Sequence, residues 1–248
     1  RMGYSPAFKK GNCYAVFLGI VLFGLFVAAA VMEWYEYSVT YTESARSGTS
    51  MTFGSTVVNY TKYMYDLEGI TKQTMDNSKQ IRNEFTSFDD TFSNVETIMQ
   101  LCQAFVIIGV VLSALLTFVL ALCFFDSLRN KFLFWVGMGT MRIIVIVTVF
   151  LILISSIVAF LGFLGVTSAF DSDNPNCQHG PCRKFIDSTR TSVDHPDTKT
   201  THQIQEWGAS AGWFLTLACI PVSIILLIVT VLNKFPIPVD SVGSGEAL

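Results

Sequence analysis

The sequence predicts a mainly α-helical membrane protein, in which a bundle of four transmembrane helices carries a small extracellular α+β domain. Of the 248 residues, 51% are hydrophobic and only 14% are charged, whereas soluble domains carry roughly a quarter charged residues. The apolar residues form long blocks and lack the alternation of a membrane β-barrel. The net charge of −3 is unlike the basic balance of nucleic-acid-binding proteins, so we expect no nucleic-acid partner.

The apolar blocks define four spans. A helix that crosses the hydrocarbon core of a bilayer needs about 20 mostly apolar residues. Four segments meet this requirement, and none of them contains Asp, Glu, Lys, Arg or His. We predict transmembrane helices at residues 13–32, 103–125, 143–166 and 208–232.

The distribution of charge orients these spans. The N-terminal tail holds three bases and no acid, whereas residues 33–101 hold ten acids and five bases. By the positive-inside rule, the tails 1–12 and 233–248 and the loop 126–142 are cytoplasmic. The loops 33–102 and 167–207 then face outward. The plasma membrane is the expected location, with an internal membrane as the alternative.

The first outer loop divides into two predicted elements. Residues 33–58 are rich in Tyr, Thr, Val and Ser around a turn signal at 46–48, which predicts a β-hairpin. Across 59–102, side chains recur at steps of four and three, which predicts a heptad helix that continues into the second span. The apolar part of this heptad seam consists of Ile81, Phe85, Phe88, Phe92, Val95 and Met99.

The heptad seam has two interpretations. It packs against the hairpin and the second outer loop of its own chain, or it pairs with the same helix of a neighbouring subunit. The bulk of Phe85, Phe88 and Phe92 does not suit a tight two-stranded coiled coil. Packing within the chain is therefore favoured.

Three covalent modifications are suggested by the sequence. Asn59 begins the chain's only N-glycosylation sequon, in the first outer loop. Cys177 and Cys182 lie in the second outer loop, where an oxidising compartment would join them in a disulfide. Cys13 and Cys123 lie at the cytoplasmic ends of their spans, as palmitoylated cysteines often do. Ordinary interfacial thiols are an equal alternative for this last pair.

Small side chains recur at helical spacing within the spans. Such faces let two helix backbones approach closely, and this drives association in lipid. They serve either the chain's own bundle or contacts with neighbouring subunits. The stripes comprise Gly109, Ser113 and Thr117 in the second span and Gly208, Gly212 and Thr216 in the fourth.

Catalysis is not expected. Pumps and ion-coupled transporters usually need ionisable groups at depth in the membrane, and the four spans contain none. The six-residue segment Cys177–Cys182 contains one histidine, which is not a standard metal-binding spacing. We therefore expect neither a metal nor another cofactor.

The overall plan resembles the claudin and peripheral-myelin-protein superfamily. That resemblance rests on four spans, cytoplasmic ends, a larger first outer loop and Trp34 near the start of that loop. The paired first-loop cysteines of the family are missing here, so the likeness concerns topology. It implies a β-sheet and an extracellular helix between the first two spans, and a role in adhesion, barrier formation or membrane-domain organisation.

The leading functional hypothesis is a non-enzymatic membrane organiser or adhesion protein that associates with its own copies. Its expected partners are the lipid bilayer, further copies of the chain and other membrane proteins. A large-pore channel subunit of connexin-like or innexin-like topology is one alternative. An accessory subunit of a larger membrane complex is another.

Overall fold

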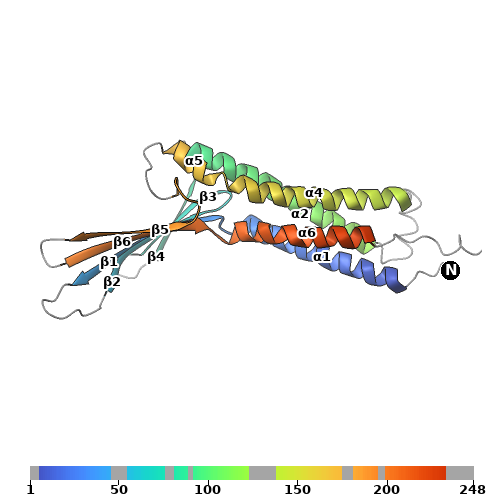
Figure 1. The fold of residues 1–248 in the computed structure, drawn as a ribbon, viewed down its shortest axis with the longest axis horizontal. Coiled ribbons are helices and arrows are strands. Elements are labelled where there is room, and N and C mark those ends of the chain that lie inside the picture. The colour runs from blue at the N-terminus through green and yellow to red at the C-terminus, as the bar shows by residue number, and fades with distance from the viewer. Residues whose placement is uncertain are drawn as a thin grey trace, which may run out of the picture. The chain divides into compact units, whose positions relative to one another are not determined.

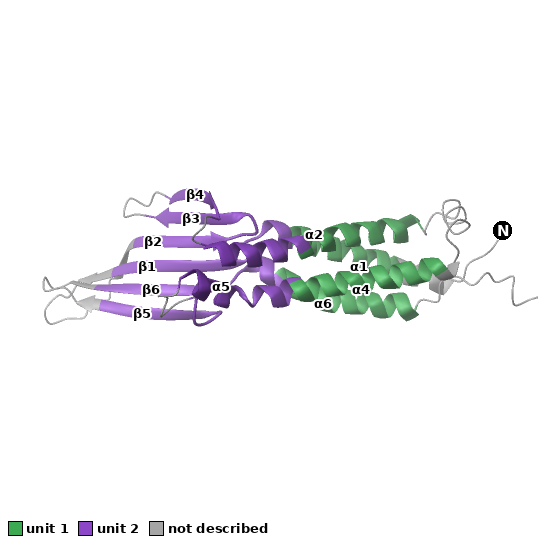
Figure 2. Ribbon diagram, turned by 90° about the horizontal axis from the view of Figure 1, so that it is seen from above, with its two compact units in different colours: residues 1–28, 105–158, 215–248 green, residues 29–104, 159–214 purple. Residues whose placement is uncertain are grey.

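The computed structural model describes residues 6–45, 55–75, 81–88, 92–122, 138–174, 181–194 and 199–232. The chain forms two compact units, each assembled from separate stretches of sequence (Figure 2). The first unit contains residues 1–28, 105–158 and 215–248 and is helical where described. The second unit contains residues 29–104 and 159–214 and holds a β-sheet with adjoining helical turns.

Four helices in the described part of the chain are long and apolar enough to cross a membrane, as the sequence predicts. Their outward surfaces carry large apolar side chains; Phe17, Phe118 and Ile143 are each more than 60% exposed. A soluble protein rarely exposes so continuous an apolar surface. A short helix, α5, follows the third long helix after a two-residue turn. The helices are α1 (Pro6–Val31), α2 (Ser93–Leu122), α4 (Met138–Phe163), α5 (Val166–Asp173) and α6 (Ala211–Leu232).

The described strands, which Figure 1 labels, form one antiparallel sheet with the order β4-β3-β2-β1-β6-β5 (Figure 2). The first predicted outer loop contributes β1 to β4, and the second contributes β5 and β6. The central strand β1 joins the two sets, because Tyr35 lies opposite both Tyr65 of β2 and Ala209 of β6. The strands are β1 (Tyr35–Ala45), β2 (Ser55–Tyr65), β3 (Gly69–Met75), β4 (Ile81–Ser87), β5 (Asp187–Asp194) and β6 (Lys199–Ala209).

The predicted heptad helix over 59–102 is wrong for most of its length, because three strands occupy it and α2 begins only at Ser93. The turn between β2 and β3 explains part of the difference. The Asp66 carboxylate accepts hydrogen bonds from the backbone N–H groups of Glu68 (2.9 Å) and Gly69 (2.7 Å). Such turns reverse the chain. The predicted hairpin exists, but β2 extends to Tyr65.

An aromatic cluster forms the core of the second unit. Tyr35 is fully buried, and its ring lies 5.6 Å from that of Phe170 in α5 and 6.3 Å from that of Phe163 in α4. Tyr65 packs edge-on against Phe170 at 5.4 Å. The sheet is therefore attached to α5 and to the end of α4 through aromatic contacts, which are favourable beyond the area they bury.

The start of α2 is fixed by a carboxylate from α5. Asp173 accepts hydrogen bonds from the backbone N–H groups of Asn94 (3.0 Å) and Val95 (2.9 Å). A helix leaves its first N–H groups without partners, and a negative charge there is favourable. This contact joins the two predicted outer loops near the helical end of the sheet.

Candidate association surface of the sheet

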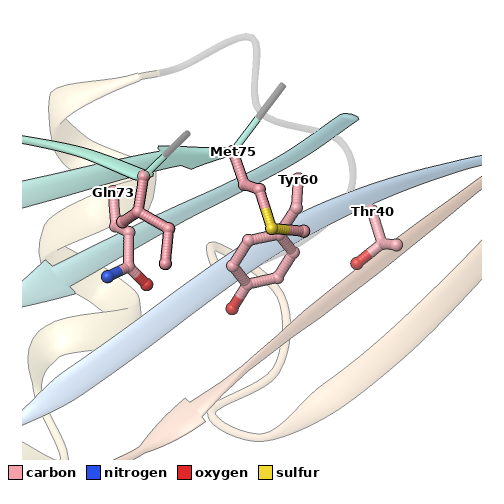
Figure 3. Close-up of a pocket in the computed structure, with 5 residues that line it drawn as sticks. Thr40, Tyr60, Gln73 and Met75 are labelled. Carbon is pink, nitrogen blue, oxygen red and sulfur yellow. The ribbon is translucent and has the colours of Figure 1, made fainter. Parts of the chain in front are cut away.

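One face of the sheet carries a row of mainly apolar side chains, which we call the apolar row. Cross-strand pairing aligns its members through five adjacent strands, since residues directly opposite one another share a face. A cavity of about 300 Å³ opens along this row, and Tyr60 and Met75 lie beside each other in its lining (Figure 3). The apolar row runs Ile81, Met75, Tyr60, Thr40 and Ile204.

The strand β4 ends this row and forms one edge of the described sheet. All seven of its residues are exposed. Ile81 is 62% exposed and Phe85 is 60% exposed, and both lie on the face of the apolar row. Edge strands present unpaired backbone groups to other chains, and proteins usually protect them. Two large exposed apolar side chains make β4 a candidate association surface.

Charged side chains flank the apolar row on the same face. Lys62 forms a 2.9 Å ion pair with Glu36 of the neighbouring strand. Burial raises the pKa of the Tyr60 hydroxyl, while the charge of Lys62 opposes that rise. Tyr60 therefore stays a neutral hydrogen-bonding group at physiological pH.

The opposite face of the sheet is aromatic. The rings of Tyr37 and Tyr63 stack at 6.0 Å, and the Lys72 ammonium lies 5.9 Å from the centre of the Tyr63 ring. These three side chains line an open cavity of about 470 Å³ together with Phe92. Burial, with a smaller contribution from neighbouring tyrosines, raises the pKa values of Tyr35 and Tyr65 well above normal. Both are therefore neutral hydroxyls that complete the core.

The heptad-seam residues are not brought together on one helix. Ile81 and Phe85 belong to the exposed β4, and Phe88 follows that strand outside any helix. Phe92 lies next to Phe170 at 6.4 Å. The remaining two, Val95 and Met99, are fully buried in α2.

The predicted modification sites lie apart. Asn59 is exposed on β2, opposite Tyr41 of β1. Cys13 is exposed on α1. Cys182 is buried. Cys177 and Cys123 lie outside the described residues, so the disulfide and the second palmitoylation site stay predictions.

The small residues of the second span lie against α1 of the same chain. A Cβ added at Gly109 would overlap the ring of Phe26, and one added at Gly19 would lie 2.6 Å from Oγ1 of Thr117. Ser113 is fully buried, and its hydroxyl donates to the Val110 carbonyl at 3.0 Å. This stripe therefore serves packing within the chain.

The predicted small-residue stripe of the fourth span is wrong at its start. Gly208 lies in β6, where an added Cβ would contact Ile186 at 3.3 Å, and α6 begins only at Ala211. Gly212 packs against Trp34, and Thr216 is fully buried. The backbone of β6 continues to Ala209 because it pairs with β1 up to Tyr35.

The sequence reasoning missed the edge strand β4 as a site. Its signal was present as an alternation of period two, with Ile81 and Phe85 on one face and Arg82 and Glu84 on the other. Such alternation is typical of a strand. The steps of four and three that join Ile81 to Phe85 and Phe88 obscured it.

No protein-family model matches the chain, and no curated protein matches it. Within the described ranges, no group of three His, Cys, Asp or Glu side chains could hold a metal ion. The surfaces of the sheet are the features of this chain from which a function can be inferred.

Proposed function

We propose that the chain is a non-enzymatic membrane adhesion or organiser protein whose sheet faces outward and associates with other copies of the chain. The single observation that carries this proposal is the exposed edge strand β4, with Ile81 and Phe85 both at least 60% exposed on one face. Burying such side chains against a partner is favourable by about 1.5–3 kcal/mol each.

The proposal places both tails in the cytoplasm and the sheet outside the plasma membrane. The excess of bases in the N-terminal tail supports this orientation, as does the acidic balance of residues 33–101. In this arrangement the sheet is available to chains on other membranes. The resemblance to the claudin and peripheral-myelin-protein superfamily points to the same class of function.

Glycan attachment at Asn59 tests the orientation. Because the Asn59 side chain is exposed on β2, a glycosylating cell should modify it if this loop is lumenal during synthesis. Digestion with a glycosidase should increase gel mobility, and Asn59→Gln should abolish that shift. Asn83→Gln, outside any sequon, is the control. Cleavage of the sheet by a protease supplied only from the cytoplasmic side would show that the proposed orientation is wrong.

Vesicle clustering tests the function. Purified protein reconstituted into two differently labelled vesicle populations should cause them to cluster, without ion conduction at channel-like rates. The combined variant Ile81→Ser and Phe85→Ser should reduce clustering at least about tenfold, because two apolar anchors are lost. Ile186→Ser is the matched control, since Ile186 is 57% exposed near the other edge.

Three results would contradict the proposal. The first is wild-type protein that leaves the vesicles dispersed at every density tested. The second is channel-like ion flux, which would favour the large-pore channel alternative. The third is equal clustering by wild type and the combined variant, since the exposed strand β4 is the observation on which the proposal rests.

A further inference from the structure

The residues of β4 have a chemical symmetry about Asn83. An apolar and a basic residue, Ile81 and Arg82, precede Asn83, and an acidic and an apolar residue, Glu84 and Phe85, follow it. Pairing with β3 places Ile81, Asn83 and Phe85 on one face, and Arg82 and Glu84 on the other. All five are exposed. Among the described residues, neither Arg82 nor Glu84 has an ion-pair partner.

We propose that β4 pairs with β4 of a second copy, antiparallel about a two-fold axis at Asn83, and that the second copy is anchored in a facing membrane. This inference rests on the proposed function and specifies its contact. Arg82 then lies opposite Glu84 of the second copy, and Ile81 lies opposite its Phe85. Each pair occurs twice, as a symmetric interface requires.

The charges favour this register over the two adjacent positions of the axis. Residues opposite one another in an antiparallel pair lie on the same face, and side chains alternate between the faces along each strand. The two-fold axis must therefore lie between the two copies of one and the same residue. Moving the axis to Arg82 or to Glu84 would place two like charges directly opposite each other, which is destabilising. With the axis at Asn83, both charged pairs are opposite in sign and both large apolar residues meet.

The other edge of the sheet has only part of this symmetry. About Ser192, Arg190 of β5 would lie opposite Asp194 of a second copy, but no two large apolar residues would meet. Half of the eight residues of β5 are Ser or Thr, and its Asp187 is already in a 2.6 Å ion pair with Lys184. That ion pair and a backbone hydrogen bond from Ser188 lower the pKa of Asp187. Of these two edge strands, β4 therefore combines complementary charges with two large apolar residues.

The proposed pairing reverses the direction of the second sheet. Within the second unit, helical turns adjoin the sheet at the end marked by Tyr35 and Ala209, where α1 precedes β1 and α6 follows β6 (Figure 2). An antiparallel pairing reverses the second sheet, so its helical end points the opposite way. Because α1 and α6 join each sheet at that end of the chain, we place the second copy in a facing membrane. Many weak contacts of this kind would add through avidity.

Charge exchange between labelled vesicle populations tests the register. Vesicles that carry Arg82→Glu should cluster with one another at least about tenfold less than wild type, and so should vesicles that carry Glu84→Arg. Mixing these two populations should restore clustering, since every like-charged pair becomes an opposite pair. The double variant should cluster with itself and not with wild type. Low ionic strength should enlarge each difference.

Cysteine cross-linking tests the axis. The Cα atoms of opposed antiparallel residues lie about 4.5–5.5 Å apart, within the range that a disulfide bridges. Asn83→Cys should therefore cross-link to itself between vesicles under a membrane-impermeant oxidant. Arg82→Cys should not cross-link to itself but should cross-link to Glu84→Cys.

The possible failures are distinguishable. If wild-type vesicles cluster but the mixed charge variants fail to recover, the β4 register is wrong while the proposed function stands. Cross-links of Asn83→Cys confined to one vesicle population would contradict the facing-membrane arrangement. A lack of clustering by wild type would overturn the proposed function itself.

Discussion

Replacing Trp34 with Ala should lower the free energy of unfolding by about 3–5 kcal/mol, the range measured for large aromatic truncations in cores. The Trp34 side chain is fully buried, and its ring packs edge-on against Phe163 at 5.2 Å. Its indole N–H donates a 2.8 Å hydrogen bond to the carbonyl of Ala29 near the end of α1, where helix carbonyls lack partners. Thermal unfolding of the full chain in detergent, followed by size exclusion, would measure the loss.

The backbone of Trp34 also connects two distant segments of the chain, so the substitution should affect more than the packing of the side chain. Its N–H donates to the carbonyl of Tyr65 at 2.8 Å, and its carbonyl accepts from Ser210 at 2.9 Å. Trp34 therefore links the end of β2 to the segment that precedes α6. Loss of order at Trp34 should therefore destabilise both predicted outer loops together.

A second substitution tests how closely the Trp34 ring packs against Gly212. A Cβ added at Gly212 would lie 2.6 Å from the indole nitrogen of Trp34, so Gly212→Ala should be destabilising in wild type. It should be better tolerated beside Trp34→Phe, whose smaller ring leaves space. Phe214→Ala, which removes a half-exposed ring, is the control. Equal stability of Trp34→Ala and Phe214→Ala would contradict this account.

The four long helices were predictable because their signal is local. An apolar block of about 20 residues needs no knowledge of distant partners. The ends of the helices were less predictable. For example, the helix that was predicted to begin near residue 59 begins only at Ser93, where its first turn is capped by Asp173 from another part of the chain. No pattern within 93–102 shows that contact.

The sheet could be predicted only in part, since it depends on pairing between distant residues. The hairpin of β1 and β2 had a local signal in its β-branched and aromatic residues. The pairing of β1 with β6 joins Tyr35 to Ala209, and no local pattern reveals such a partner. Over residues 59–92, a repeat typical of a helix overlaps with the alternation typical of a strand. Polar residues such as Thr71 and Thr74 are compatible with both patterns, so they do not distinguish a helix from a strand.

The spacing of the small residues in α2 predicts a helix-packing face but does not identify the helix that packs there. The spacing of Gly109, Ser113 and Thr117 correctly indicated a helix-packing face. It did not distinguish a neighbouring subunit from the chain's own α1. The structure assigns this face to Phe26 and Gly19 of the same chain. The face is thus occupied within the chain, and we infer that contacts between copies arise at the sheet.

Replacing Gly109 with Leu should destabilise the helical unit by about 1–3 kcal/mol or more, as overpacking of a filled core does. Even a Cβ at this position would overlap the ring of Phe26, which is fully buried. Gly109→Ala should already be harmful, although Ala favours a helix over Gly by about 1 kcal/mol. Unfolding of the purified chain in detergent would show a lowered midpoint temperature.

The matched control lies on the partner helix. A Cβ added at Gly24 of α1 would meet no atom within 4 Å, so Gly24→Ala should be neutral or slightly stabilising. Combining Gly109→Ala with Phe26→Leu should recover part of the loss, because a smaller side chain leaves room for the new methyl group. The double-mutant cycle then measures the coupling between the two positions. Independent, additive effects of Gly109→Ala and Phe26→Leu would show that the two residues do not pack together.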